Sequence, residues 1–569
     1  MRKFLAVLFL LCTLPFVSDA CRKSELHIVT TGDVHGRFFS RDFVTGEPRN
    51  SLMSVKYYVD SLRAAVGEEN VLLLDCGDIL QGDNSSYYFN YVATEEAHVY
   101  PKMANYMGYD ACTVGNHDSE TGHPVYDRVR REMDQYGIPW LAGNALKDDG
   151  SSYFQEYCVV RKNGRKILIM GYNNANIDHW LVPELWEGMH HERLVPFVQQ
   201  RVDLIKASVK PDAVIVLVHS GTGQGTGDSI ENEGLDLFNS LHGVDVLVTA
   251  HDHSPALRQK PEMVMVNAGA RCSNVGHAVL GFKGRKVVDR RAEIVRMNRF
   301  AVDTAMEEAF RPEWETIHEF TVRPIGELEM PIVTREAYTG MNAYLDFLHT
   351  VQLSTSGADV SLSAPLTFNG VVEKGAVLFG DLFTIYPYEN MLYVLNLTGK
   401  EIKDLLEYSY DRWIVTPGDH VLNIRQRSDS RTGAERWSFA NRSYNFDSAA
   451  GISYTVDVTQ PFGSRVCIST LANGTPFDES ATYEVAMTSY RATGGGSLLT
   501  EGAGIDHEEL QARVVRKYPE IRQLIYGYFT DNKVVGPSLV MNRSILGEWK
   551  FIPESLTAPL LAADMALVF

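Results

Sequence analysis

At residues 26–36 the chain reads LHIVTTGDVHG. A largely apolar run, Leu26–Thr31, ends in a glycine-flanked loop that contains Asp33 and His35. Short runs rich in valine and isoleucine are typical of strands that are buried on both faces of a sheet. The polar loop then lies at the carboxyl end of the strand, which is where ligands bind in open α/β sheets.

The same arrangement recurs along the N-terminal half, where a short apolar run is followed by a polar loop and a helical stretch. The further runs are Val71–Leu74, Ala111–Val114, Ile167–Met170, Ala213–Val218, Val244–Val248 and Met263–Val266. Alternating strands and helices predict an α/β domain, which we expect to end near Arg299. Residues 301–320 are predicted to form a helix that leads to a second domain.

Four later loops also carry side chains that bind metal ions. They add five candidate ligands to Asp33 and His35, namely Asp78, Asn116, His219, His251 and His253. Imidazole and carboxylate groups without thiolates suit Zn, Mn, Fe or Co. Two such ions that share a carboxylate can bind the oxygens of a phosphate group. The sequence therefore predicts a site for two divalent metal ions, whose identity the ligand types leave open.

In order, the loops show D-x-H, G-D, G-N-H-D, H-x-G and A-H-x-H, a set that resembles the metallophosphoesterase superfamily over residues 25 to about 285. The resemblance implies a calcineurin-like αββα sandwich. It also implies two ligand sets that share a bridging carboxylate: Asp33, His35, Asp78 and His253 in one, and Asp78, Asn116, His219 and His251 in the other.

The resemblance gives His117 a different role. This histidine would face the substrate phosphate and stabilise charge on the phosphoryl group or the leaving oxygen. In the family an acidic residue orients the histidine, and here either Glu120 or Asp118 can fill that role.

The C-terminal half, from about Glu336, resembles the α+β substrate-binding domain of the two-domain 5′-nucleotidase family. The 5′-nucleotidase and sugar-nucleotide hydrolase branch has Asn-Gly-Gly-x-x-Arg where this chain has Ser361–Leu366, without an arginine. This looks more like the 2′,3′-cyclic-nucleotide 2′-phosphodiesterase/3′-nucleotidase branch. Three stretches agree with it: DLFTIYP at 381–387, YNFD at 444–447 and SYRATGGG at 489–496.

In that family two aromatic rings enclose the base, and the matching positions here are Phe446 and Tyr490. Stacking on a ring contributes about 1–3 kcal/mol per base and tolerates every base. Asn445 and Asp447 would contact the base or the ribose hydroxyls. The resemblance thus implies a nucleotide substrate.

The first twenty residues have the pattern of a signal peptide, with Arg2 and Lys3 before the apolar run Phe4–Val17. Cys21 follows, so the pattern also matches a loose lipoprotein box, and simple cleavage and a lipid anchor on Cys21 both stay open. No later run is long enough and apolar enough to span a bilayer. We expect an exported protein, periplasmic or at the cell surface.

Charge and cysteine content exclude other classes. The 569 residues carry a formal net charge of −19, so no nucleic-acid polymer is expected as a partner. The seven cysteines show no C-x-x-C spacing, which argues against a disulfide framework or a thiolate zinc site. We expect five of them to be small core residues: Cys76, Cys112, Cys158, Cys272 and Cys467.

We therefore expect a signal peptide at 1–20, a catalytic domain at 22–300, a linker at 301–335, a nucleotide-binding domain at 336–535 and a tail at 536–569. The predicted function is that of an exported dinuclear-metal phosphohydrolase of nucleotides, with 2′,3′-cyclic and 3′-nucleotides preferred. The alternatives are a 5′-nucleotidase or UDP-sugar hydrolase, an enzyme acting on a non-nucleotide ester or a thiosulfonate, and a non-catalytic surface binding protein. The last predicts a missing metal ligand, yet all seven are present.

Overall fold

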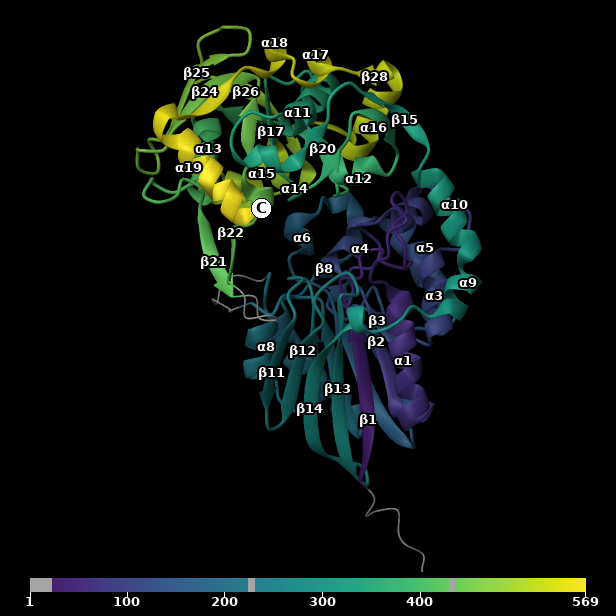
Figure 1. Ribbon diagram of the computed structural model, residues 1–569. Helices are drawn as coiled ribbons and strands as arrows, with labels where there is room; N and C mark the ends of the chain where they lie inside the picture. The colour runs from purple at the N-terminus through teal and green to yellow at the C-terminus, as the bar shows by residue number, and fades with distance from the viewer. Residues whose placement is uncertain (1–22, 224–230, 429–434) are drawn as a thin grey trace, which may run out of the picture.

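The computed structural model describes residues 23–223, 231–428 and 435–569; the predicted signal peptide and Cys21 lie outside them. Two domains are joined by helices α9 (Thr304–Ala309) and α10 (Arg311–Thr321) (Figure 1). The predicted single connecting helix is thus two helices, because Pro312 starts a new first turn. In the described part of the chain, no helix is both long and apolar enough to cross a membrane.

The N-terminal domain contains two six-stranded sheets. The first consists of β14 (Lys286–Arg296), β13 (Asn274–Lys283), β1 (Lys23–Thr31), β2 (Val71–Asp75), β3 (Ala111–Thr113) and β4 (Trp140–Leu141). The second consists of β11 (Ala256–Lys260), β12 (Met263–Asn267), β10 (Val246–Thr249), β9 (Ala213–Val218), β7 (Arg165–Tyr172) and β6 (Tyr157–Lys162).

Apolar side chains of the two sheets meet in a shared core, for example Ile28 and Leu72 with Ile169 and Ile215. Helices cover both outer faces. On the first sheet these are α1 (Leu52–Val66), α3 (Val99–Met107) and α5 (His123–Gln135), and on the second α7 (Leu194–Val209) and α8 (Gly234–Ser240). This is the αββα sandwich that the resemblance implies, and the prediction is confirmed.

The order of the strands places the polar loops together. Strands β1, β2 and β3 are parallel, and so are β7, β9, β10 and β12. The loops that follow β1, β2, β3, β9 and β10 therefore emerge where parallel strands end, and Figure 1 shows this edge turned toward the C-terminal domain.

The C-terminal domain is built on a five-stranded sheet. Its strands are β23 (Ser448–Ala450), β17 (Val360–Ser363), β26 (Thr482–Thr488), β20 (Met391–Thr398) and β27 (Val514–Glu520). The long helices α11 (Ala343–Ser356), α13 (Gly399–Trp413) and α16 (Ile521–Asn532) pack on it. A capping box between Thr398 and Glu401 starts α13.

Both ends of this domain reach beyond the predicted limits. Strand β15 (Pro324–Leu328), inside the predicted linker, pairs with β19 (Gly375–Leu378) and β28 (Val534–Val535). In the predicted tail, β29 (Trp549–Ile552) pairs with β24 (Ile452–Asp457), and α19 (Glu554–Val568) packs on β22 (Glu435–Phe439). Segments 324–328 and 549–568 are therefore part of the C-terminal fold.

The cysteines follow the prediction with one exception. Cys76, Cys112, Cys158 and Cys272 are free and buried, whereas Cys467 is exposed. The prediction for Cys467 is wrong because its side chain is exposed on β25 (Val466–Leu471), a strand in which only Val466 is buried.

Candidate metal centre and active site

Several predicted ligands have an unusual backbone. Asp33, His35, Asp78, His251 and His253 have φ angles of 49°, 49°, 58°, 79° and 56°. Residues other than glycine rarely adopt this left-handed conformation, and such residues gather at functional sites. The loops hold one another in it, since the Asp33 N–H donates to Gly77 O over 2.8 Å and the His35 N–H to Asp78 O over 2.9 Å.

The structure brings the first predicted ligand set together. One donor atom from each of Asp33, His35, Asp78 and His253 lies within 4.8 Å of the others. The Nε2 atoms of His35 and His253 are 2.9 Å apart, and His253 Nε2 is 3.7 Å from Asp33 Oδ1. His253 is the most exposed member, with 45% of its side chain accessible.

The second set lies next to the first and shares Asp78 with it. Donor atoms of Asp78, His219 and His251 lie within 4.8 Å of one another. Asn116 joins them, because its Oδ1 is 2.9 Å from His251 Nδ1 and 3.1 Å from His219 Nε2. All seven predicted ligands therefore converge on one place, with Asp78 between the two sets.

The local chemistry fits a pair of divalent ions. Asp78 Oδ2 is buried and accepts no well-aligned hydrogen bond, although His219 Nε2 lies 3.1 Å away. Metal-binding histidines usually donate their second ring N–H to a carbonyl or carboxylate. Here His35 Nδ1 is 3.0 Å from Gln81 O, His219 Nδ1 is 2.7 Å from Cys76 O, and His251 Nε2 is 3.3 Å from Glu231 Oε1. The opposite nitrogens are thus left for ligation.

His117 and Glu120 form the predicted pair at the edge of the centre. His117 Nδ1 lies 2.6 Å from Glu120 Oε2, and Gln81 Nε2 donates to the same oxygen over 2.8 Å. Burial alone would lower the pKa of His117, but the negative charge of Asp78 and the bond to Glu120 raise it to about 9. The ring is thereby oriented with Nε2 left for a substrate.

The carboxylate that meets the His117 imidazole is that of Glu120, so the alternative in which Asp118 orients the histidine is wrong. The buried Asp118 carboxylate accepts four backbone N–H bonds of 2.8–3.0 Å, from Asp78, Ile79, Leu80 and Gly115. These bonds tie the loop after β2 to α4 (Asn116–Glu120), which begins with the ligand Asn116. Asp118 therefore positions the ligands of the centre.

Phe446 lies in the core of the C-terminal domain, which corrects its predicted role in stacking. The side chain has no accessible surface. Trp413 stacks on it at 5.6 Å and 6°, and Phe439 meets it edge-on at 5.4 Å. A base cannot reach this ring.

Asn445 and Asp447 are engaged by an arginine that lies just after Tyr490. Arg491 forms a buried ion pair with Asp447, with a shortest distance of 2.7 Å, and its Nη1 donates to Asn445 Oδ1 over 3.3 Å. Its Nη2 donates to Tyr444 O over 3.1 Å. These contacts tie residues 444–447 to the segment after Tyr490, and both oxygens of the buried Asp447 carboxylate are paired with Arg491.

Tyr444 is the aromatic residue that the sequence analysis missed. It is partly exposed, and so is Tyr490. Burial is the main cause of the raised pKa of the Tyr444 hydroxyl, and the neighbouring Tyr490 hydroxyl adds to it. A hydroxyl-bearing ring suits such a half-exposed position better than phenylalanine. Within the stretch YNFD, this preference favours Tyr444 over Phe446 as the ring that faces a ligand.

A cavity lies between the two domains. Its walls include Glu120 and Trp180 from the N-terminal domain and Glu389 and Tyr490 from the C-terminal domain. The partner of His117 and a predicted base-stacking ring thus face the same space.

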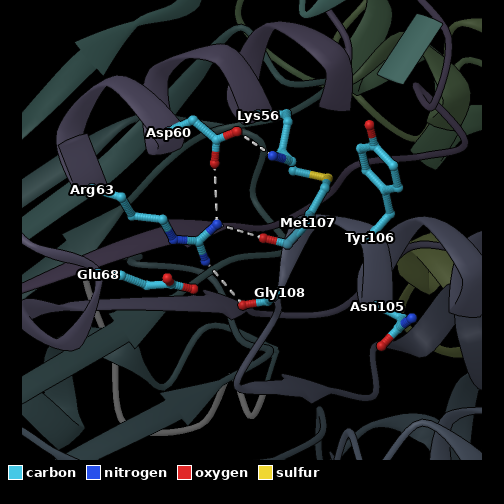
Figure 2. Close-up of a pocket in the computed structure, with 8 residues that line it drawn as sticks. All are labelled: Lys56, Asp60, Arg63, Glu68, Asn105, Tyr106, Met107 and Gly108. Carbon is cyan, nitrogen blue, oxygen red and sulfur yellow. Dashed lines mark hydrogen bonds and ion pairs between the residues drawn. The ribbon is translucent and has the colours of Figure 1, made fainter. Parts of the chain in front are cut away.

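A separate surface pocket lies beside α1 and α3 (Figure 2). Its cations are already engaged: Lys56 pairs with Asp60, and Arg63 donates to the carbonyls of Met107 and Gly108 over 2.8 and 3.1 Å. None of the residues that line it is a predicted ligand, and Arg63 caps the end of α3. This pocket is therefore not the candidate active site.

Known proteins match both halves of the chain. The calcineurin-like phosphoesterase family matches residues 26–255, and the 5′-nucleotidase C-terminal domain family matches residues 324–501. A trifunctional nucleotide phosphoesterase of Bacillus subtilis is 23% identical over 93% of this chain, which spans 39% of that relative's length. A 2′,3′-cyclic-nucleotide 2′-phosphodiesterase/3′-nucleotidase of Salmonella typhimurium is 24% identical, over 87% of this chain and 85% of that protein.

A solved structure agrees with this comparison. A Staphylococcus aureus protein assigned as a 5′-nucleotidase superposes with a TM-score of 0.77 at 23% identity, over 93% of this chain and 100% of that one. The family of the catalytic domain implies divalent metal ions, and the convergent Asp and His side chains are a candidate site for them. The chain thus carries, in this order, a domain of the calcineurin-like phosphoesterase family and a 5′-nucleotidase C-terminal domain, and these families indicate a phosphoric ester hydrolase that acts on nucleotides.

Proposed function

We propose that this chain is an exported 2′,3′-cyclic-nucleotide 2′-phosphodiesterase/3′-nucleotidase that releases nucleoside and phosphate. The observation that carries the proposal is the interdomain cavity in which Glu120 and Tyr490 meet. In this cavity Glu120, which orients His117, faces Tyr490, whose ring can stack on a base. The signal-peptide pattern of residues 1–20 supports export. The lipoprotein-box pattern that ends at Cys21 supports a lipid anchor on this cysteine.

The preference for cyclic and 3′-nucleotides is supported by residues 361–366. Ser361–Ser363 belong to the buried strand β17, and Ser361 Oγ is engaged by His349 Nδ1 at 2.9 Å and Gln352 Oε1 at 3.2 Å. No arginine is present there to meet the phosphate of a 5′-nucleotide. The name of the Salmonella relative agrees with this branch.

The residues of the chain have separable roles in this reaction. Two divalent ions, held by the seven ligands, would neutralise phosphate oxygens and activate water as a nucleophile. His117, held through Nδ1 by Glu120, directs Nε2 toward the leaving oxygen. Tyr490, with Tyr444 beside it, binds the base and thereby fixes the position of the phosphate.

A comparison of initial rates tests the proposal. The purified chain is assayed on 2′,3′-cyclic AMP, 3′-AMP and 5′-AMP, with Mn²⁺ and with a chelator. We expect the initial rates on 2′,3′-cyclic AMP and 3′-AMP to exceed the rate on 5′-AMP at least tenfold, which corresponds to about 1.4 kcal/mol in the activation barrier. The chelator should abolish all three rates. A preference for 5′-AMP contradicts the substrate assignment, and rates that survive chelation contradict the metal requirement.

A further inference from the structure

Trp180 packs against one of the predicted metal ligands. It ends helix α6 (Ile177–Trp180), and its ring stacks on the imidazole of His251 with centroids 5.3 Å apart and an angle of 18°. Glu231 Oε1 lies 3.3 Å from Nε2 of that imidazole, and Nδ1 lies 2.9 Å from Oδ1 of Asn116, the neighbouring candidate ligand. The imidazole is therefore held at Nε2 and on one face, with Nδ1 turned toward the metal-ion set.

The same residue also contacts the C-terminal domain. Thr493 lies three residues beyond Tyr490. Its hydroxyl proton has three carbonyl acceptors within reach, of which Trp180 O at 2.7 Å is nearer than Ser489 O and Tyr490 O at 3.1 Å each. Beside Trp180, the ring of His179 meets that of His507 at 4.9 Å. Figure 1 shows α6 at the face of the N-terminal domain that is turned toward the C-terminal domain. Trp180 thus links a candidate ligand to the loop that carries Tyr490.

Ordinary core packing does not account for this tryptophan. Among the described residues, Trp180 belongs to none of the buried apolar clusters, and its side chain is partly exposed to the interdomain cavity. Val182, two residues further on, is 3% exposed and packs into the C-terminal core. The docking of this segment therefore already has an apolar anchor that does not involve Trp180.

We propose that Trp180 is a positioning residue that couples the second metal-ion set to the docking of the C-terminal domain. The indole ring holds the His251 imidazole in the orientation in which it lies next to Asn116. The hydrogen bond from Thr493 to the Trp180 carbonyl holds the backbone of Trp180 in place, and it forms when the C-terminal domain is docked with Tyr490 at the cavity. The proposal rests on the proposed function only in treating His251 as a ligand. It predicts that the second set weakens when the ring is removed, whereas the first set, which Trp180 does not contact, is retained.

Binding of Mn²⁺ to the metal-free full chain, measured by calorimetry without substrate, tests the role of the ring. We expect Trp180→Ala to keep one ion at wild-type affinity and to bind the second about 10- to 100-fold more weakly, a range typical of groups that orient ligands. Trp180→Phe, which retains a stacking ring, should stay within about threefold of wild type. His179→Ala, which leaves the Trp180–His251 stack and the Thr493 bond in place, should leave both affinities unchanged.

The outcomes are distinct. Wild-type binding of both ions by Trp180→Ala overturns the proposal, and so does a Trp180→Phe variant as weak as Trp180→Ala. The retained first ion shows that the variant is folded. If Trp180→Ala yields no folded protein, the comparison of Trp180→Phe with the Thr493 variants described next decides the matter. Because no substrate is present, a preference for 5′-nucleotides would contradict the proposed function and leave this result standing.

The link to the C-terminal domain has its own test. Thr493→Val removes the hydroxyl at nearly constant shape, and Thr493→Ser retains it. We expect Thr493→Val to weaken the second ion and to raise KM for 2′,3′-cyclic AMP more than it lowers kcat, and Thr493→Ser to behave as wild type. Wild-type metal affinity and KM in Thr493→Val contradict the coupling.

Discussion

Asp118 is the residue whose replacement should separate ligand positioning from ligation. Each of its oxygens accepts two backbone N–H bonds in a site without solvent access. In Asp118→Asn, the amide NH₂ faces two of these donors, and each buried unsatisfied N–H costs about 1–3 kcal/mol. We expect the free energy of unfolding to fall by at least about 2 kcal/mol, with weaker Mn²⁺ binding. Urea denaturation measures the former.

The matched control is Asp149→Asn, a similar change at an exposed loop carboxylate that caps Ser151. Its effect should stay within about 0.5 kcal/mol. Equal stability losses in the two variants would contradict the special role of Asp118.

Replacing Phe446 should mainly reduce stability, whereas replacing Tyr444 or Tyr490 should mainly weaken the binding of nucleotides. Phe446→Ala creates a core cavity and should reduce stability by about 3–5 kcal/mol. Tyr490→Ala and Tyr444→Ala remove partly exposed rings and should raise KM for nucleotides by a factor that corresponds to about 1–3 kcal/mol. Hydrolysis of p-nitrophenyl phosphate, which has no base, is the control and should change little. A stable Phe446→Ala variant with a raised nucleotide KM would contradict this division.

The seven candidate ligands could be identified from sequence because each follows a buried apolar run, so the order of the strands dictates their convergence. Trp180, Glu231 and Tyr444 lie in a turn or in helical segments of three or four residues, which are too short for a periodic sequence pattern. Their roles depend on which surfaces meet when the domains dock, and this information is distributed over both halves of the chain. Similarly, the choice between Asp118 and Glu120 depended on side-chain direction in α4.

At the level of elements, strands buried on both faces were predicted well and half-exposed strands were not. The runs at Val71–Leu74, Ala213–Val218 and Met263–Val266 correspond to β2, β9 and β12, in which every residue is buried. Strand β14, by contrast, is mostly exposed or partly exposed and contains a charged residue at about every second position. A search for continuous apolar runs therefore missed β14. It also missed the partner strand β13, which is buried but whose apolar residues are interrupted by Gly276, His277 and Gly281.

Helix α19 gives a prediction at this scale. Its buried residue Asp564 accepts the N–H groups of Val421 and Leu422 over 2.8 Å each, and its Oδ1 lies 2.6 Å from His420 Nδ1. Asp564→Ala leaves both N–H groups without an acceptor, so we expect the free energy of unfolding of the C-terminal domain to fall by about 2 kcal/mol or more. The Tm should fall accordingly. The matched control is Glu554→Ala at the exposed start of the same helix. An unchanged Tm in Asp564→Ala would show that α19 is not anchored in this way.

For the whole molecule, the domain interface contains a titratable contact. Tyr91 of the N-terminal domain donates to Glu389 Oε2 of the C-terminal domain over 2.8 Å. Burial raises the pKa of Glu389 from 4.5 to about 8; the Arg522 charge opposes this shift and the Glu520 charge adds to it. Because the folded pKa is the higher one, the associated stability is fully present below pH 4.5 and is lost as the pH rises through about 8.

Glu389→Gln keeps an acceptor for Tyr91 and cannot ionise. We therefore expect its Tm to equal that of wild type near pH 5 and to exceed it at pH 8.5, as measured by calorimetry over this range. The exposed control Glu373→Gln should follow the wild-type profile. Parallel pH profiles for Glu389→Gln and wild type would contradict the assigned pKa direction.

The account depends most on two divalent ions sharing Asp78. The most direct measurement is the metal content of the chain after equilibration with Mn²⁺ and removal of free ion, in wild type and in two ligand variants. We predict two ions per wild-type chain, one in His253→Ala, and none in Asp78→Ala, which removes the carboxylate common to both sets. A single ion in the wild-type chain, or two in Asp78→Ala, would contradict the account.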